Sequence, residues 1–475
     1  MVSDCHGRAV EADTLWWVSD CRSDRVVTRG TPSVSSECPA DQRHPAPLTE
    51  NAPMFNTPSI EKLSGIIDLF LDHASRINER QPRKYWYPLS MATYGTEEVI
   101  QALDSMCSFR TTMWEKTQAF EERFAAYNES MSATMVNSGS SADLLMSFLL
   151  RDPETPLVQA GDEVLVPAVT WPTHVWSPLM AGLNVQLVDV DPFTLNMSLD
   201  DLERKITAKT KALFLVHLMG NPCDMRRIME IARDHNLLVL EDCCEALGSV
   251  YEGKRVGNFG MCSSFSFFFA HHMCTMEGGM ICTNDNSLVP KLRTLRAHGW
   301  TRNLDEKHYD LRNYDVDHRY AFVNWGFNVR PTEVQAGFGL AQLAKLPAFN
   351  SRRNDLANRF YEHVPRWPGL LKPRVSPLAE PVWFALPLMI DSRASFVARD
   401  MREFLEERGV ETRPIVAGNI ARQPAARFLL KETNCADLPG AQAVHERGFY
   451  VGLSPMTSDD NMQKMIDTIQ SFFPR

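Results

Sequence analysis

Two adjacent histidines, His271 and His272, stand in an aromatic-rich stretch of the chain. The stretch reads SFSFFFAHHMCTMEGGMICT, with Ser266 before the histidines and Gly278-Gly279 after them. A histidine has an unperturbed pKa of ~6.5, which suits removal of a proton from carbon near neutral pH. Two adjacent histidines are, however, more often part of a solvated turn or a packed core. The pair alone therefore leaves both interpretations open.

A run of small residues, Asn137-Ser138-Gly139-Ser140-Ser141-Ala142, joins an expected strand to an expected helix. Small residues allow backbone N–H groups to approach an anion, and a helix N-terminus favours negative charge. Gly139 and Ser140 are therefore candidate ligands for a phosphate group. A capped helix after a turn has the same pattern, so this motif does not decide by itself.

The stretch around His271 resembles the cofactor segment of the nucleotide-sugar aminotransferases, the DegT/DnrJ/StrS-type family. The family motif is S-F-x-x-x-K followed by G-G, and here His271 takes the lysine position after Ser266. The resemblance runs from Tyr87-Pro88-Leu89 to the C-terminus and implies a fold type I α/β protein that uses pyridoxal 5′-phosphate (PLP). An imidazole cannot form the Schiff base that the family lysine forms with PLP. The replacement resembles a histidine-bearing branch of the family, the sugar 3-dehydratases.

The same resemblance implies which residues bind the cofactor. Gly139, Ser140 and Ser266 would bind its phosphate. Trp171, directly after an expected strand, would stack on the pyridine, because a flat aromatic side chain packs well on an electron-poor ring. Without the neighbouring motifs, Trp171 would be interpreted as a core tryptophan.

Two acids, Asp242 and Glu245, follow another expected strand. By resemblance, Asp242 pairs with the pyridine nitrogen and keeps it protonated, so that PLP acts as an electron sink. The spacing between Asp242 and His271 matches the family, although an acid at a strand end could also cap a helix. Glu245 stands where the family usually has glutamine near the phenolic oxygen of the cofactor. An acid at that place also occurs in the dehydratase branch.

A later segment resembles the family regions at the sugar and at the subunit interface. In the histidine branch, a histidine and an arginine near here face the substrate, which would be His298 and Arg302. A polar helix end followed by a loop is an equally good interpretation of either residue. Asn328, in a G-x-N-x-R motif, would reach the cofactor phosphate of the neighbouring subunit. This implies a homodimer with shared active sites.

The resemblance implies a glutamate-dependent 3-dehydratase that cycles between PLP and pyridoxamine 5′-phosphate (PMP), with His271 as base. The expected substrate is GDP-4-keto-6-deoxy-D-mannose, giving a 4-keto-3,6-dideoxy sugar and ammonia. A relative that acts on a CDP-linked sugar holds an iron–sulfur cluster, but here no cysteine lies between Cys282 and Cys435 to bind one. Another nucleotide, an aminotransferase that leaves the amine on the sugar, and a non-catalytic family member remain alternatives.

Alternating strands and helices must position these residues, and they predict a mostly parallel sheet covered on both faces. The expected strands are 133–136, 163–166, 185–190, 212–216, 237–241, 264–268 and 280–283. The helices expected between the early strands are 142–150, 174–181, 199–205 and 226–234.

Three regions are expected along the chain. Residues 1–57 read by composition as a disordered tail, and Met54 is an alternative start. Residues 58–340 would form a large PLP-binding domain with N-terminal helices, and residues 341–475 a smaller C-terminal α/β domain. Helices are expected at 333–343 and 346–364, on either side of the boundary.

The composition is that of an ordinary globular protein, with 44% hydrophobic and 23% charged residues. A net charge of −10, without any basic run, argues against a nucleic-acid partner. The eleven cysteines contain no C-x-x-C pair, so we expect free thiols in a reducing cytosol and no metal site. No apolar run of ~18 residues occurs, and the expected location is the cytoplasm, without a membrane partner.

Overall fold

The computed structural model of the chain describes residues 58–79, 84–302, 304 and 308–474. The tail expected at residues 1–57 lies outside this part. Within it, no helix combines the length and the apolar character that a membrane crossing requires.

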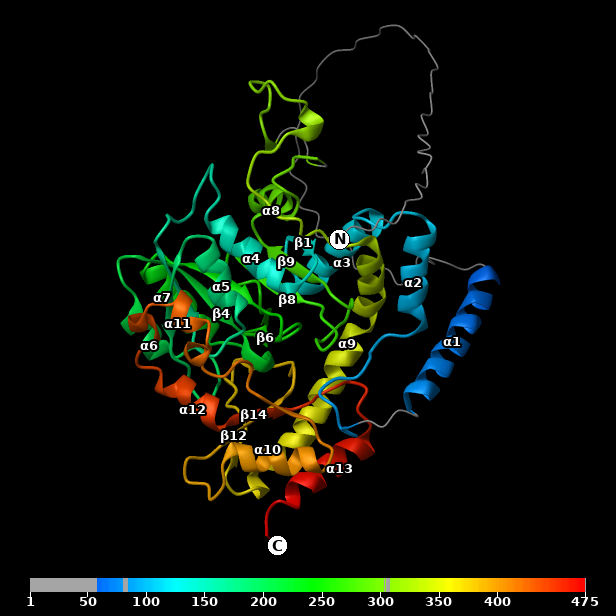
Figure 1. The fold of residues 1–475 in the computed structure, drawn as a ribbon, viewed down its shortest axis with the longest axis vertical. Coiled ribbons are helices and arrows are strands. Elements are labelled where there is room, and N and C mark those ends of the chain that lie inside the picture. The colour runs from blue at the N-terminus through cyan, green and yellow to red at the C-terminus, as the bar shows by residue number, and fades with distance from the viewer. Residues whose placement is uncertain (1–57, 80–83, 303, 305–307, 475) are drawn as a thin grey trace, which may run out of the picture. The chain divides into compact units, whose positions relative to one another are not determined.

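A seven-stranded sheet forms the centre of the first part of the chain (Figure 1), with the strand order β1-β9-β8-β5-β4-β2-β3. Only β9 runs antiparallel to its neighbours in this sheet, so the expectation of a mostly parallel sheet is confirmed. The strands are β1 (Ser132–Val136), β2 (Glu163–Pro167), β3 (Asn184–Val188), β4 (Thr210–Val216), β5 (Leu238–Asp242), β8 (Cys262–Ser266) and β9 (Gly279–Thr283).

The sheet is covered on both faces because alternate residues of each strand point to opposite sides. In β4, Phe214 belongs to one apolar core and Leu213 and Leu215 belong to the other. The first core is shared with α4 (Gly139–Leu150), α5 (Thr173–Met180) and α8 (Val289–Arg296). The second is shared with α3 (Glu115–Asn128), α6 (Leu199–Lys205), α7 (Met225–Asp234) and α9 (Glu333–Tyr361).

The strand expected at residues 264–268 ends earlier, at Ser266. Phe267 nevertheless is fully buried and packs against Phe120 and Phe124 of α3. Its backbone amide donates to the carbonyl of Gly278, and its carbonyl accepts from a residue of the following turn. The apolar run therefore continues into the core after the strand has ended, and an apolar run alone cannot locate that end.

The two helices expected at 333–343 and 346–364 form the single helix α9, which continues through Pro347. Leu343 and Leu346, on either side of the expected gap, pack in the same core. Lys345, inside that gap, bonds to Glu98 of α2 (Thr96–Cys107) at 2.9 Å. These contacts hold the helix continuous across a position where the sequence pattern indicated a break. Figure 1 shows α9 passing from beside α2 and α3 to α13 (Asp459–Gln470).

The last part of the chain forms a second sheet with its own apolar core. Its strand order is β10-β12-β14-β13, and its pairs are antiparallel. The predicted boundary between residues 340 and 341 falls inside α9, so the division into two domains stays a prediction. The strands are β10 (Leu370–Leu371), β12 (Leu386–Ile390), β13 (Thr412–Pro414) and β14 (Gly448–Val451), with helices α10 (Ala398–Glu407), α11 (Ala426–Leu429) and α12 (Pro439–Arg447).

Two further groups complete the described elements. A small sheet, ordered β11-β6-β7, joins β6 (Val250–Tyr251) and β7 (Lys254–Arg255) to the distant β11 (Ala379–Glu380). The N-terminal helix α1 (Pro58–Glu79) contacts α2.

Candidate active site

The strand register brings three segments together at one edge of the sheet. Val136, at the end of β1, and Ser266, at the end of β8, both pair with Gly279 of β9. Asp242, the last residue of β5, pairs with Ser264 of β8. Because the C-terminal ends of parallel strands share one edge, the turn after β1 and the loops after β5 and β8 meet there.

The turn after β1 leads into α4. The space around Gly139, at the start of this helix, is too small for a side chain. A Cβ atom on Gly139 would lie 2.6 Å from Cβ of Ser266 and 2.9 Å from Sγ of Cys244. Ser138 caps the helix, its hydroxyl accepting from the amide of Ser141 at 3.1 Å. Ser140 is exposed in the first turn. Gly139 and Ser266, both predicted phosphate ligands, are thus in contact at a helix N-terminus, where amide groups lack intrahelical partners.

Asp242 is a buried carboxylate surrounded by donors. Its Oδ1 accepts from the amide of Cys244 at 3.2 Å, and its Oδ2 accepts from Oγ of Ser264 at 3.1 Å. Oδ2 also lies 3.1 Å from Nε2 of His174 on α5. Burial alone would raise the pKa of Asp242, but His174 and the Cys244 amide lower it below its ordinary value. Asp242 is therefore held as a carboxylate.

A second carboxylate, Asp143 of α4, shares the same histidine. Its Oδ2 lies 3.4 Å from Nε2 of His174, and its Oδ1 accepts from Ser264 at 2.6 Å. Burial raises the pKa of Asp143, His174 opposes this rise, and the charge of Asp242 adds to it. Burial would lower the pKa of His174, but the two carboxylates raise it to about 10. One imidazolium thus faces two acids of unequal strength.

Glu245 follows Asp242 on the same loop. Its Oε2 accepts from the amide of Met219 at 2.8 Å. Burial raises the pKa of Glu245 to about 7, opposed by the Met219 amide and supported by the charge of Asp242. Near neutral pH this side chain therefore exchanges between a neutral acid and a carboxylate.

The ring of His271 is fixed in a single tautomer by a backbone group. Its Nδ1 lies 2.7 Å from the carbonyl oxygen of Cys244, which can only accept, so Nδ1 carries a proton. Burial lowers the pKa of His271 to about 4, well below the ~6.5 expected from the sequence. The ring is neutral near pH 7, and its Nε2 keeps a lone pair that can accept a proton.

His272 has a different environment. It is fully buried, its Nε2 lies 3.0 Å from the carbonyl oxygen of Val382, and its Nδ1 has no hydrogen-bond partner among the described residues. Burial holds its pKa well below the ordinary value. His272 packs in the core beneath the site, whereas His271 is only partly buried.

The remaining predicted site residues are Trp171, near α5, and His298, Arg302 and Asn328 in the later segment. Trp171 is 56% exposed immediately before α5, and its carbonyl accepts from the amide of His174. His298, Arg302 and Asn328 are exposed, and none of their contacts within the described residues reaches His271 or Asp242. Within the described residues, the side-chain contacts of Arg302 and Asn328 stay inside this later segment, with Trp300 and Arg330.

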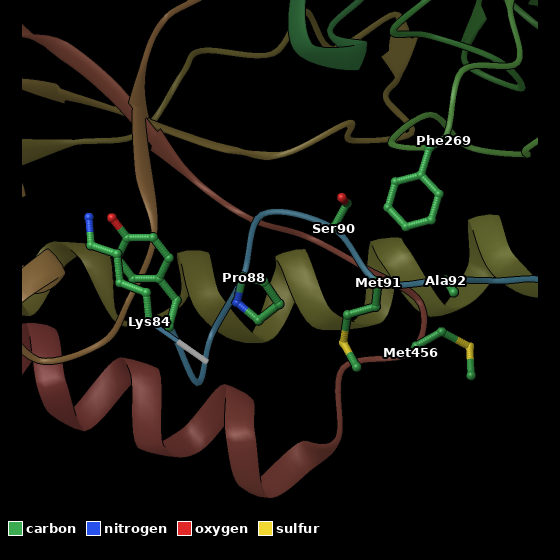
Figure 2. A pocket seen from close by; sticks show the side chains of 8 residues that line it. Lys84, Pro88, Ser90, Met91, Ala92, Phe269 and Met456 are labelled. Carbon is green, nitrogen blue, oxygen red and sulfur yellow. The ribbon is translucent and has the colours of Figure 1, made fainter. Parts of the chain in front are cut away.

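A hollow of about 600 Å³ lies beside the loop that carries His271 (Figure 2). Phe269, two positions before His271 on that loop, lines this hollow. The other lining residues come from the segment before α2 and from the chain near the C-terminus: Lys84, Tyr85, Pro88, Ser90, Met91, Ala92 and Met456.

The sequence did not indicate a role for Asp143, His174 or Ser264. Ser264 donates to Asp242, and His174 lies at ion-pair distance from both Asp242 and Asp143. Two of them stand near predicted cofactor-binding residues. Asp143 follows Gly139 by about one helical turn, and His174 lies just after Trp171. Their roles depend on contacts between α4, α5, β5 and β8, which no local pattern reveals.

Comparison with known proteins places this geometry in a family. Residues 93–470 match the DegT/DnrJ/EryC1/StrS aminotransferase family. A GDP-4-keto-6-deoxy-D-mannose 3-dehydratase of Yersinia pseudotuberculosis is 35% identical over 387 residues, 81% of this chain and 98% of the relative. A dTDP-4-dehydro-2,6-dideoxy-D-glucose 3-dehydratase of Saccharopolyspora spinosa is 34% identical over 397 residues, 81% of this chain and 86% of the relative.

A solved structure is similar in fold as well. The crystal structure of a GDP-4-keto-6-deoxymannose-3-dehydratase with a trapped PLP-glutamate geminal diamine matches with a TM-score of 0.76 and 33% identity. The match covers 81% of this chain and all of that one. The fold is therefore that of the PLP-dependent fold type I transferases, and the chain belongs to the DegT/DnrJ/EryC1/StrS aminotransferase family.

Proposed function

We propose that this chain is a PLP-dependent 3-dehydratase that removes the C3 hydroxyl of a nucleotide-linked 4-keto-6-deoxy sugar, with glutamate as amino donor. The proposed substrate is GDP-4-keto-6-deoxy-D-mannose, and the products are a 4-keto-3,6-dideoxy sugar and ammonia. The observation that most directly supports this proposal is the state of His271, which stands at the position of the family lysine. Its imidazole is neutral and partly buried, with a free Nε2. A base that cannot bond covalently to the cofactor favours elimination over ordinary transamination.

The residues present fit PLP. Because Gly139 has no side chain, the N-terminus of α4 packs directly against Ser266, and its amides, which lack intrahelical partners, favour a phosphate. Asp242 is held as a carboxylate, as a protonated pyridine nitrogen requires. When bound, the cofactor would carry the amino group from glutamate and act as an electron sink during loss of the hydroxyl.

The side chains around this cofactor would have separate roles. His271 accepts a proton at Nε2 while the Cys244 carbonyl holds its Nδ1–H and therefore the ring orientation. Asp242 supplies a fixed negative charge. Glu245, with a pKa near 7, can donate or accept a hydrogen bond at neutral pH. Trp171 offers an exposed aromatic face for stacking.

The substrate and partner assignments are part of this proposal. His298 and Arg302 contact the sugar nucleotide, and Asn328 completes the phosphate site of a second copy in a homodimer. Their exposure, without contacts to the base of their own chain, supports a site shared between subunits. The free state of all eight cysteines in the described part supports a reducing, cytoplasmic location.

Mass spectrometry of the sugar tests the function. The protein is incubated with PLP, glutamate and GDP-4-keto-6-deoxy-D-mannose, with glutamate omitted as the control. We expect a product that has lost one oxygen and gained no nitrogen, together with ammonia. A product that carries an amine would replace the proposal with an aminotransferase. Unchanged sugar, with cofactor bound, would overturn the assignment of GDP-4-keto-6-deoxy-D-mannose as the substrate.

A further inference from the structure

His174 lies at the centre of the buried network, and the mechanism proposed above does not use it. Its Nδ1 is 2.6 Å from Oγ1 of Thr170, and its Nε2 faces Asp242 at 3.1 Å and Asp143 at 3.4 Å. Both carboxylates and the ring are at most 4% exposed. The edge of the ring packs against Phe214 of β4, with centroids 4.9 Å apart. The imidazole is therefore held in one orientation between two acids.

The hydrogen-bond donors around the acids are unevenly divided. Asp143 accepts from Oγ1 of Thr173 at 2.7 Å and from Ser264 at 2.6 Å. The single hydroxyl proton of Ser264 cannot serve both acids at once, and Asp242 is the more distant acceptor at 3.1 Å. Within the described residues, His174 is the one cationic group in an ion pair with Asp242. Asp242 therefore depends on His174 and the Cys244 amide.

The position of Nε2 indicates that His174 acts on the two carboxylates mainly through its charge. Nε2 is at ion-pair distance from both carboxylates, yet it is not aligned with either oxygen for a hydrogen bond. Two carboxylates that share a buried site disfavour each other's ionisation, and a cation between them relieves this repulsion. Removal of the cation would therefore change the charge on the pair even if the packing were preserved.

We propose that His174 is a positioning residue that holds the Asp242 carboxylate ionised and in place by balancing the charge of Asp143. The proposal rests on the proposed function in one respect, namely that Asp242 supports the cofactor. It makes a specific statement about charge. His174→Gln leaves two acids facing each other, and Asp143→Asn in the same chain removes one of them.

The first test needs no cofactor. Histidine ring signals of the isotope-labelled full chain are followed by NMR against pH, and His174 is assigned by its loss in His174→Gln. We expect the His174 ring to stay doubly protonated beyond pH 8, because its pKa is raised to about 10. A ring that is neutral at pH 7 would overturn the proposal.

The second test is PLP affinity, measured by fluorescence quenching, together with unfolding in urea. We expect His174→Gln to bind PLP roughly tenfold or more weakly. A tenfold loss corresponds to about 1.4 kcal/mol, the size expected when a neighbouring charge that stabilises Asp242 is removed. The double variant Asp143→Asn/His174→Gln should recover much of the affinity. The control is His217→Gln, which breaks another buried histidine–carboxylate pair, with Glu241 at 3.2 Å, on the opposite face of β5 from the side chain of Asp242.

The outcomes separate this inference from the proposed function. Equal weakening in the single and double variants would mean that His174 acts by packing alone and would overturn the proposal, as would unchanged affinity in His174→Gln. Recovery in the double variant supports it, even if the sugar product later proves to carry an amine. His217→Gln should lose stability but keep its PLP affinity.

Discussion

A partly buried imidazole differs from a lysine in what it can do beside PLP, and the surroundings of His271 decide how it is used. The Cys244 carbonyl accepts a hydrogen bond from Nδ1–H, and burial keeps the ring neutral. Nε2 is therefore unprotonated, and available as a base, at pH values well above about 4. A base with a pKa of about 4 is weaker than an ordinary histidine, but it is fully in its active form near neutral pH.

Replacement of His271 should separate proton transfer from cofactor binding. In His271→Asn we expect PLP to bind, because Gly139, Ser266 and Asp242 remain, while dehydration falls by roughly 10²–10⁴-fold with the general base gone. His271→Lys should also lose dehydration, and its bound PLP should become covalently trapped on borohydride reduction. The rates are measured by product mass spectrometry. His235→Asn, an exposed histidine change, is the control, and a His271→Asn protein that dehydrates at the parental rate would contradict the assignment.

Glu245 should give the bound cofactor a transition near neutral pH. Its pKa is raised to about 7, so it is neutral below that pH and ionised above it. We expect the absorbance of bound PLP to change between about pH 6 and 8 in the parent, as the nearby charge appears. Glu245→Gln, which cannot ionise, should abolish the change, and Asp200→Asn on the exposed first turn of α6 should preserve it. Persistence of the same transition in Glu245→Gln would assign it to another group.

At the scale of elements, the site depends on the meeting of α4 with the ends of β5 and β8. The space at Gly139 is closed on two sides, by Ser266 and by Cys244. Gly279 is equally confined, because a Cβ there would lie 2.3 Å from the carbonyl oxygen of Ser138. Two glycines thus let a helix N-terminus approach two strands closely enough to present its amides at the sheet edge.

Gly139→Ala should disrupt that junction. The added Cβ would meet Cβ of Ser266 and Sγ of Cys244 inside ordinary contact distance, so α4 must shift. We expect a loss of about 1–3 kcal/mol in the free energy of unfolding and weaker PLP binding, measured by denaturation and by fluorescence. Gly65→Ala, in α1 with open space around its Cβ, is the matched control. Unchanged PLP affinity in Gly139→Ala would remove the phosphate role from this turn.

At the scale of the whole molecule, the proposal of a shared site predicts that a second copy of the chain takes part. Asn328 is exposed, and its side-chain Oδ1 accepts from Nε of the nearby Arg330 at 2.9 Å. Yet the carbonyl of the next residue, Val329, accepts from the amide of Asn137, in the turn between β1 and α4. The segment is therefore anchored beside one site while its asparagine side chain faces outward.

Co-expression of two inactive variants tests this arrangement. His271→Asn and an Asn328 variant each damage both sites of their own homodimer. A mixed dimer would contain one intact site, so it should keep about half of the parental activity if the dimer is a symmetric pair with shared sites. Differently tagged subunits allow the mixed dimer to be purified. Mixed dimers without activity, or a chain that remains monomeric in light scattering, would contradict the shared site.

The amino-acid sequence by itself determined the features that depend on local spacing. The alternation of strands and helices predicted a mostly parallel sheet, since strand and helix periodicity are properties of neighbouring residues. The motif around Ser266 and His271, and the small residues before α4, likewise predicted a cofactor segment and a phosphate-binding turn. Local patterns failed at the end of β8 and within α9, where long-range packing decided the outcome.

Only the tertiary structure decided the protonation states. The sequence indicated a histidine of ordinary pKa, whereas burial and the Cys244 carbonyl make His271 a neutral base with a defined tautomer. The sequence also could not reveal that His174 and Asp143 surround Asp242. Charge interactions depend on distances of a few ångströms and on the exclusion of water. Both arise when segments remote in the chain meet at the sheet edge, and no spacing along the chain encodes them.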